Sequence, residues 1–99
     1  MGSVMISVQA EADIDSIIEY SKVEWGSRQT DKYLSKLEDE FELLVRNPLI
    51  GRSCDSILPS LRRLEVGKHV VFYLSRTDGI LIVRVLHQRM LPGKSRFEF

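Results

Sequence analysis

Apolar residues recur every three or four positions through the first half of the chain. Over residues 13–25 this spacing predicts a helix that begins with aspartates in its first turn, where carboxylates complement the helix dipole. Gly26 is placed to end it as a cap with positive φ. A longer helix is predicted from Ser27 until Asn47-Pro48, because the residue before proline is pushed out of helical geometry. Its apolar stripe comprises Tyr33, Leu34, Leu37, Phe41, Leu44 and Val45.

The second half has the alternation of β-strands. Strands are predicted over residues 61–66, 70–76 and 80–87, and a short one over residues 4–8. Asp78-Gly79 between two apolar runs is a strong hairpin signal. The expected fold is α+β, in the order β-α-α-β-β-β, with a helical hairpin packed on a twisted antiparallel sheet.

A two-residue turn at Asp78-Gly79 fixes a register for this hairpin, in which Phe72 faces Val85 and Tyr73 faces Arg84. One face then lies under the helices and the other is partly open, and a slip of one residue would exchange them. The face expected under the helices carries Val70, Phe72, Leu74, Val83, Val85 and His87. The partly open face carries Val71, Tyr73, Ser75, Ile82, Arg84 and Leu86.

Length and composition favour a single domain over residues 1–99, since the chain is 43% hydrophobic and 28% charged. No apolar run is long enough to span a membrane, and no exported leader is evident. The single cysteine, Cys54, cannot form an internal disulfide, and with two histidines it cannot complete a structural zinc site. We therefore expect a cytoplasmic protein without metal or cofactor.

The net charge is zero, from 14 basic and 14 acidic residues. This argues against a protein that binds nucleic acid through an overall positive charge. Residues 1–47 nevertheless hold ten acidic and five basic side chains, whereas residues 48–99 hold four acidic and nine basic ones. An acidic partner would dock on the second half if the halves occupy different faces; otherwise they are two differently solvated surfaces.

Each candidate for acid–base or nucleophilic chemistry also has a structural interpretation. His87 could act as a general acid or base near neutral pH. The predicted register instead places it on the core face opposite Val70, with its ring hydrogen-bonded to a backbone group. His69 is expected to be exposed in a turn. Cys54 is expected to anchor its loop or to be incidental, rather than to act as a nucleophile.

Four arginines, Arg62, Arg63, Arg84 and Arg89, could together bind phosphate or acidic side chains. The structural alternative is that Arg84 stacks on Tyr73 and Arg63 makes an internal ion pair. Phe97 and Phe99 stand on a tail broken by glycine and proline, so they either fold back on the body or anchor a partner.

A set of stretches in one order and spacing covers nearly the whole chain. It begins with residues 10–17, followed by Trp25-Gly26 and Tyr33. It continues through Asn47-Pro48, the run 51–55 and Leu61-Arg62-Arg63, and it ends with the runs 69–73 and 82–87 and with Arg89-Met90. In these stretches the chain resembles ParE-type toxins of bacterial toxin–antitoxin pairs, within the RelE/ParE superfamily. After Met90 many relatives have an aspartate, whereas this chain has Leu91-Pro92.

The resemblance implies the helical-hairpin fold and an inhibitor without a catalytic centre. A ParD-like antitoxin with an amphipathic tail would neutralise it, and the free toxin would poison DNA gyrase, with no sequence-specific nucleic-acid binding of its own. The residues expected to bind the antitoxin are Trp25, Tyr33, Leu37, Phe41, Arg62, Arg63, Tyr73 and Arg84. Those expected to contact the target are Arg89, Met90, Lys94, Arg96, Phe97 and Phe99.

Two alternatives stay open. The related RelE-like toxins cut messenger RNA on the ribosome, and here Arg63, Tyr73, Arg84 and His87 would have to supply that chemistry. Neutral total charge disfavours this, because phosphate contacts dominate affinity for RNA. The other alternative is an inactive module with the toxin fold.

Overall fold

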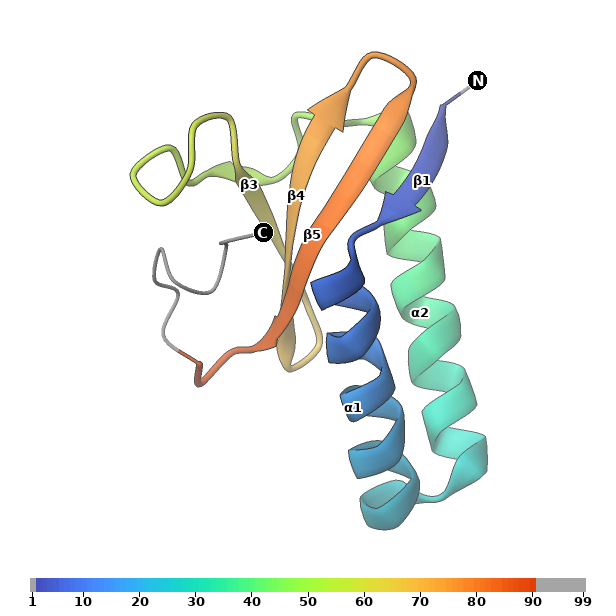
Figure 1. Cartoon of the computed structure of the whole chain (residues 1–99). Helices are drawn as coiled ribbons and strands as arrows, with labels where there is room; N and C mark the ends of the chain where they lie inside the picture. Colours follow the sequence, from blue (N-terminus) through green and yellow to red (C-terminus); the bar gives the residue numbers. More distant parts are fainter. Residues whose placement is uncertain (1, 91–99) are drawn as a thin grey trace.

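The computed structural model describes residues 2–90 and places two helices on one face of a five-stranded sheet (Figure 1). The elements are β1 (Ser3–Ile6), α1 (Val8–Trp25), α2 (Ser27–Arg46), β2 (Arg52–Ser53), β3 (Arg62–Val66), β4 (His69–Arg76) and β5 (Gly79–His87). The strand order is β1-β5-β4-β3-β2. The predicted order of helices and strands is confirmed, with β2 as an addition. The sheet is mixed rather than antiparallel, because β1 runs parallel to β5.

The first helix begins five residues before the predicted start at Asp13. Ser7 is its N-cap: the Ser7 hydroxyl accepts from the Ala10 amide at 3.0 Å and donates to the Val83 carbonyl at 2.7 Å. Such a side chain satisfies an amide that the helix leaves unpaired. Gly26 ends the helix with φ 83°, as predicted, and α2 follows at once.

The hairpin of β4 and β5 turns one residue earlier than predicted. Arg76 pairs with Gly79, so Thr77 and Asp78 form the turn. Gly79 has φ 150°, and a Cβ there would lie 1.9 Å from the Ser3 carbonyl oxygen. Glycine is therefore required because β1 pairs closely at this point, and the predicted assignment of Gly79 to the turn was wrong.

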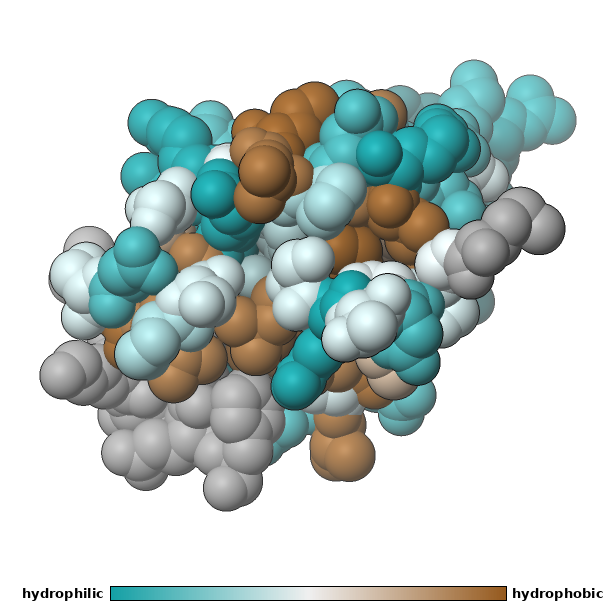
Figure 2. All heavy atoms as spheres, turned by 90° about the horizontal axis from the view of Figure 1, so that it is seen from above, coloured by the Kyte–Doolittle hydropathy of each residue, from teal (hydrophilic) through white to brown (hydrophobic). Residues whose placement is uncertain are grey.

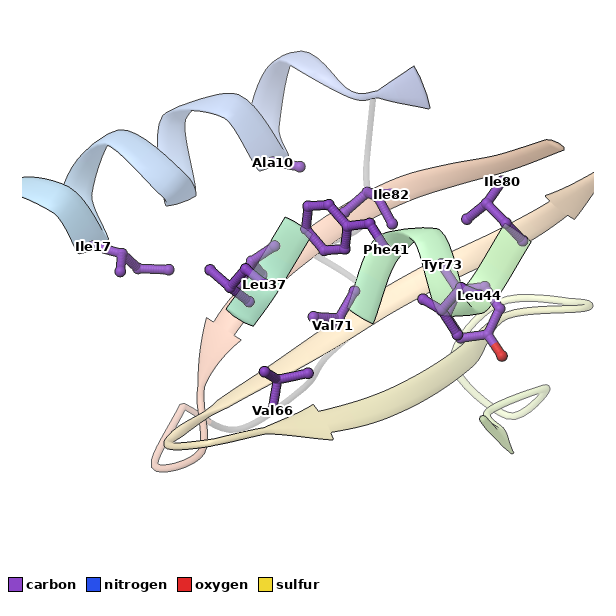
Figure 3. Packing of buried hydrophobic residues seen from close by; sticks show 11 residues of the cluster. Ala10, Ile17, Leu37, Phe41, Leu44, Val66, Val71, Tyr73, Ile80 and Ile82 are labelled. Carbon is purple, nitrogen blue, oxygen red and sulfur yellow. The ribbon is translucent and has the colours of Figure 1, made fainter. Parts of the chain in front are cut away.

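This shift exchanges the faces of β4, as expected of a one-residue slip. The helix-facing core consists of Ala10, Ile17, Leu37, Phe41, Leu44, Val66, Val71, Tyr73, Ile80, Ile82 and Val85, ten of them labelled in Figure 3. The inward assignment of Phe72 and Val83 was therefore wrong, and that of Val85 is confirmed. A bulge changes the pairing from Phe72–Arg84 to Tyr73–Ile82 and leaves Val83 as the extra residue.

The opposite face of the sheet is a second core and is not partly open. Its buried members are Cys54, Leu61, Phe72, Val83 and Leu86. The loop between β2 and β3 covers it, with Cys54 8% exposed. The expectation that Cys54 anchors its loop is confirmed.

The two ends of the molecule differ. Seen from above, the end that holds the β4–β5 turn shows apolar side chains split into separate groups by polar ones (Figure 2). At the other end, both helices extend past the β3–β4 turn (Figure 1), and Lys68 of that turn reaches the ring of Trp25, the last residue of α1. No helix within residues 2–90 is long and apolar enough to cross a membrane.

Candidate functional site

Two adjoining cavities lie where the α1–α2 connection meets the β3–β4 turn. The α1 cavity has a volume of about 580 Å³, and the α2 cavity also about 580 Å³. The first is lined by Ser16, Ile17, Tyr20, Ser21, Glu24, Trp25, Lys68, His69, His87 and Arg89. The second is lined by Trp25, Gln29, Lys32, Tyr33, Lys36, Gly67 and Lys68. Both volumes fall within the range of roughly 300–1,000 Å³ that is typical of ligand pockets.

Trp25 and Lys68 separate the cavities and belong to both. The Lys68 ammonium lies 5.6 Å from the centre of the Trp25 ring, within the distance of a cation–π contact. Trp25 is 40% exposed although it ends a helix that packs on the core. A large aromatic ring thus lies at the surface between the two cavities, in contact with Lys68.

A row of aromatic rings runs from the surface into the α1 cavity. Successive ring centroids are separated by 6.4, 6.4, 5.4 and 5.5 Å, distances typical of aromatic pairs. The row comprises Tyr20, Trp25, Tyr33, His69 and His87. These contacts fix the helical hairpin to the start of β4 and the end of β5, two inner strands of the sheet.

His69 is buried, so the prediction that it is exposed in a turn was wrong. The Tyr33 hydroxyl lies 2.6 Å from His69 Nδ1 and donates to the Val66 carbonyl at 2.9 Å. Because the hydroxyl has a single proton, His69 Nδ1 is assigned as the donor, which leaves Nε2 as an acceptor. Burial, and second the neighbouring His87, lowers the pKa of His69 to about 4, so its ring is neutral at pH 7. Burial raises the pKa of Tyr33.

His87 has the opposite arrangement of ring nitrogens. It is half-buried and pairs across the ladder with His69, so the predicted partner Val70 was wrong. Its Nδ1 accepts from the Arg89 amide at 3.1 Å, which assigns a ring proton to Nε2. The two imidazoles together give the α1 cavity one acceptor nitrogen and one donor nitrogen.

The cations around the cavities outnumber the carboxylates. Lys32, Lys36, Lys68 and Arg89 line them, all four exposed, and Glu24 is the single carboxylate in either lining. Within residues 2–90 the ion pairs are Arg52–Glu65 and Arg84–Asp13, neither of which touches this cluster. The site can therefore receive negative charge beside an aromatic surface.

The structure also places the eight residues expected to bind an antitoxin. Leu37, Phe41 and Tyr73 are core side chains, 2%, 5% and 0% exposed, so they offer no surface in this structure. The Tyr73 hydroxyl donates to the Pro48 carbonyl at 2.8 Å and accepts from the Gly51 amide at 2.9 Å. Burial raises its pKa.

Arg84 is held inside the molecule. Its Nε and Nη2 donate to the Asp13 carboxylate at 2.7 and 2.8 Å, and the Val85 amide donates to the same carboxylate at 3.0 Å. The hydrogen bond to Asp13 is the first cause that raises the pKa of Arg84. The expected stacking of Arg84 on Tyr73 was wrong, because the bulge directs the guanidinium toward α1.

Of the other expected residues, Arg62 donates to the carbonyls of Leu49 and Gly51, and Arg63 is half-buried on β3. Arg89 and Met90 are exposed just after β5. The remaining residues of the expected target-binding set, Lys94, Arg96, Phe97 and Phe99, lie outside the described residues.

Sequence reasoning missed Lys32, Lys36 and Lys68. Their signal was present: the two helix lysines are four residues apart beside Tyr33, so they share its side of α2. Nothing in the pattern indicated that the β3–β4 turn would place Lys68 beside them. No metal-binding cluster of histidine, cysteine or carboxylate residues exists within the described part of the chain.

The sequence of the chain matches one protein family. The family model described as "ParE toxin of type II toxin-antitoxin system, parDE" matches residues 4–92. Toxin ParE1 of Mycobacterium tuberculosis is 39% identical over 87 residues, which make up 87% of this chain and 89% of that protein. Toxin ParE of Escherichia coli is 34% identical over 91 residues, 91% of this chain and 88% of that protein.

A solved structure has the same fold. It is titled "Chromosomal ParDE TA system from P. aeruginosa", and it matches with a TM-score of 0.72 and 24% identity. The match covers 88% of this chain and 96% of that chain.

Proposed function

The chain belongs to the ParE toxin family of type II toxin–antitoxin systems, and from this premise we propose that it poisons DNA gyrase when free and is neutralised by a ParD-like antitoxin. The observation that carries the proposal is the match of residues 4–92 to the ParE toxin family, which spans both helices and all of the described sheet except Ser3. The proposed activity is inhibition by binding, without catalysis by the toxin itself.

The geometry favours this inhibitor over a ribonuclease of the RelE type. That nuclease would need Arg63, Tyr73, Arg84 and His87 to act on one RNA phosphate. Arg84 is instead paired with Asp13 of α1, and the Tyr73 hydroxyl is buried among backbone groups. A guanidinium and a phenol engaged in this way cannot reach a shared phosphate without breaking interactions of the fold.

The proposed target-binding region follows β5. Arg89 and Met90 begin it with exposed side chains, and residues 91–99 continue it with two further cations and two phenylalanines. Charged and aromatic side chains are common anchors of protein interfaces. The antitoxin is proposed to bind elsewhere, so that neutralisation and target recognition are separable.

The test is a gyrase assay with the purified chain. Relaxed plasmid, gyrase and ATP are incubated with increasing toxin, and supercoiled, relaxed and linear DNA are then resolved after protease treatment. Poisoning predicts linear DNA that requires both gyrase and this chain. The matched control is the chain truncated after Met90, which keeps every described element and should lose the activity.

Absence of linear DNA together with unimpaired supercoiling would contradict the proposal. The same protein added to a translation extract then separates the alternatives. Cleaved messenger RNA that disappears with Arg84→Ala, while circular dichroism shows the variant to be folded, would support the nuclease, and no effect in either assay would indicate an inactive module.

A further inference from the structure

We propose that the α1 cavity binds a free nucleoside monophosphate, with the base against the two imidazoles and the phosphate at Lys68 and Arg89. The site goes beyond the proposed function, because neither inhibition of gyrase nor neutralisation by an antitoxin requires a small ligand. Three features carry it: buried polar atoms that the fold leaves unused, exposed aromatic rings, and a rim with separate cationic and acidic sides.

The wall of the α1 cavity holds polar side chains that are buried but unpaired. Ser21 is 1% exposed and His69 is 8% exposed, and both line this cavity of about 580 Å³. Within residues 2–90, the Ser21 hydroxyl and the Nε2 atoms of His69 and His87 take part in no hydrogen bond. Every described polar side-chain atom that is shut off from solvent does have a partner, so these three atoms are open to the occupant of the cavity. Buried polar groups normally have partners, and we expect the ligand to supply them.

The two imidazoles define the edge of that ligand. His69 and His87 are cross-strand partners of β4 and β5, with ring centroids 5.5 Å apart. His69 Nε2 is an acceptor and His87 Nε2 is a donor, so a complementary ligand carries a donor beside an acceptor. A carboxylate or an ionised phosphate oxygen only accepts, so it would leave the lone pair of His69 Nε2 unpaired. Adenine has an amino donor next to a ring-nitrogen acceptor on one edge.

The aromatic rings at the mouth of the cavity suit a planar ligand. Tyr20 is 63% exposed and Trp25 is 40% exposed, and both line the cavity. Their ring planes stand at 84° to each other with centroids 6.4 Å apart, so a flat base can lie on one ring and meet the edge of the other. Bases stack on exposed aromatic side chains in this way in proteins that bind single nucleotides of a strand.

The rim of the cavity has a cationic side and an acidic side. The Gln88 amide donates to the Lys68 carbonyl at 2.8 Å, which brings the segment of Arg89 beside the β3–β4 turn. Lys68 and Arg89 are exposed, and neither has a carboxylate within ion-pair distance in the described structure. Two positive charges match one phosphate monoester, which carries about −1.5 to −2 at pH 7. Glu24 is the single carboxylate of the lining; it can accept from ribose hydroxyls and would repel further phosphates.

A free nucleotide fits this site better than the end of an RNA chain. Residues 1–47, which include both helices, carry ten acidic and five basic residues. A strand that continued from the cavity past Glu24 would run over this acidic surface, whereas nucleic-acid sites normally extend as basic stripes because each phosphate needs a cation. A single nucleotide needs only the two cations at the rim.

The experiment measures binding of AMP to the full chain by isothermal titration calorimetry. Emission of Trp25 gives a second signal from the cavity itself, because it is the sole tryptophan. Three comparison ligands isolate the contacts: adenosine lacks the phosphate, purine riboside 5′-monophosphate lacks the amino group, and 5′-phosphorylated oligoadenylate represents an RNA end. We expect AMP to bind about fivefold more tightly than adenosine and than purine riboside 5′-monophosphate, and more tightly than oligoadenylate.

Two variants assign each preference to one residue through double-mutant cycles. His69→Phe keeps a ring but removes the acceptor, so it should abolish the preference for AMP over purine riboside 5′-monophosphate and keep the preference over adenosine. Lys68→Gln, at an exposed position, should reduce the preference over adenosine about threefold and keep the other one. The matched control is Arg76→Gln, an exposed cation beside the β4–β5 turn at the opposite end of β4, which should change neither. Circular dichroism checks that each variant is folded, and if His69→Phe is not, the Lys68→Gln cycle decides.

Each outcome decides the proposal. Saturable binding of AMP that changes Trp25 emission, with each preference lost or reduced in its own variant, supports it. Absence of AMP binding at millimolar concentration, or preferences that neither variant changes, overturns it. Tighter binding of oligoadenylate than of AMP also overturns it and would identify an RNA end as the occupant. The gyrase assay tests the proposed function separately, so linear DNA from a chain that does not bind AMP refutes the nucleotide site alone.

Discussion

Replacing His69 with phenylalanine tests how much of the pH dependence of folding stability comes from one buried imidazole. The ring is 8% exposed, sits between Tyr33 and His87, and is held by its contact with the Tyr33 hydroxyl. Phenylalanine keeps an aromatic ring in the row and removes the titrating group. The Tyr33 hydroxyl retains its bond to the Val66 carbonyl.

The magnitude follows from the pKa of His69, which burial and His87 lower to about 4 in the folded chain. A histidine in an unfolded chain titrates near pH 6.5. Between these two values the unfolded state binds one more proton than the folded state, so stability decreases as the pH falls. The contribution is fully present above the unfolded pKa, and from pH 7.5 to 4.5 it decreases by about 2.5 kcal/mol.

The assay is urea unfolding of the wild type and His69→Phe at both pH values, followed by circular dichroism and by Trp25 emission. Carboxylates titrate alike in both proteins, so the difference between their pH-induced losses isolates His69. We expect the wild type to lose about 2.5 kcal/mol more than the variant. His87→Asn removes only the second cause, so it should keep most of the loss. Equal losses in the wild type and His69→Phe would refute the assignment of a buried neutral imidazole.

Three further predictions concern the body and the tail. Asp13→Ala should lower the free energy of unfolding by about 3 kcal/mol in urea titrations, because it removes the carboxylate that pairs with the largely buried Arg84 guanidinium; an unchanged midpoint would contradict this. Tyr73→Phe should cost about 2 kcal/mol by the same measurement, since two backbone groups lose the hydroxyl, and full stability would show that water replaces it. Deleting residues 94–99 should abolish poisoning of gyrase while binding of a ParD-like antitoxin persists in calorimetry; loss of both would instead indicate that Phe97 and Phe99 belong to the core.

The helices could be predicted because their signals are local. Period-3.6 spacing, Gly26 and Asn47-Pro48 determine where the hairpin turns and stops, and each acts within a few residues of its own position. The start of α1 was missed because its cap depends partly on a contact that is distant in sequence. Ser7 is a standard N-cap residue, but its second hydrogen bond reaches Val83, which is 76 residues away in sequence.

The sheet register could not be predicted because both faces of β4 and β5 are apolar. Alternation identifies a register only when one face is polar, and here the loop between β2 and β3 buries the second face around Phe72 and Leu61. The turn signal was misread because of another long-range contact: Gly79 is required by the approach of Ser3 in β1 rather than by the turn. Long-range packing thus decided two features that local patterns left open.

The charge count along the sequence located basic residues but not the basic surface. Of the cations in the second half, Arg84 is paired with Asp13, and Arg62 is bonded to backbone carbonyls. These belong to the cations whose count in residues 48–99 predicted that an acidic partner would dock on the second half of the chain. The exposed cations that meet an aromatic cavity come instead from both halves, since Lys32 of the acidic half lies beside Lys68 of the basic half. We therefore expect an acidic partner to be attracted by the exposed cations that no carboxylate of the described structure pairs, Lys32 and Lys68 among them, rather than by Arg84.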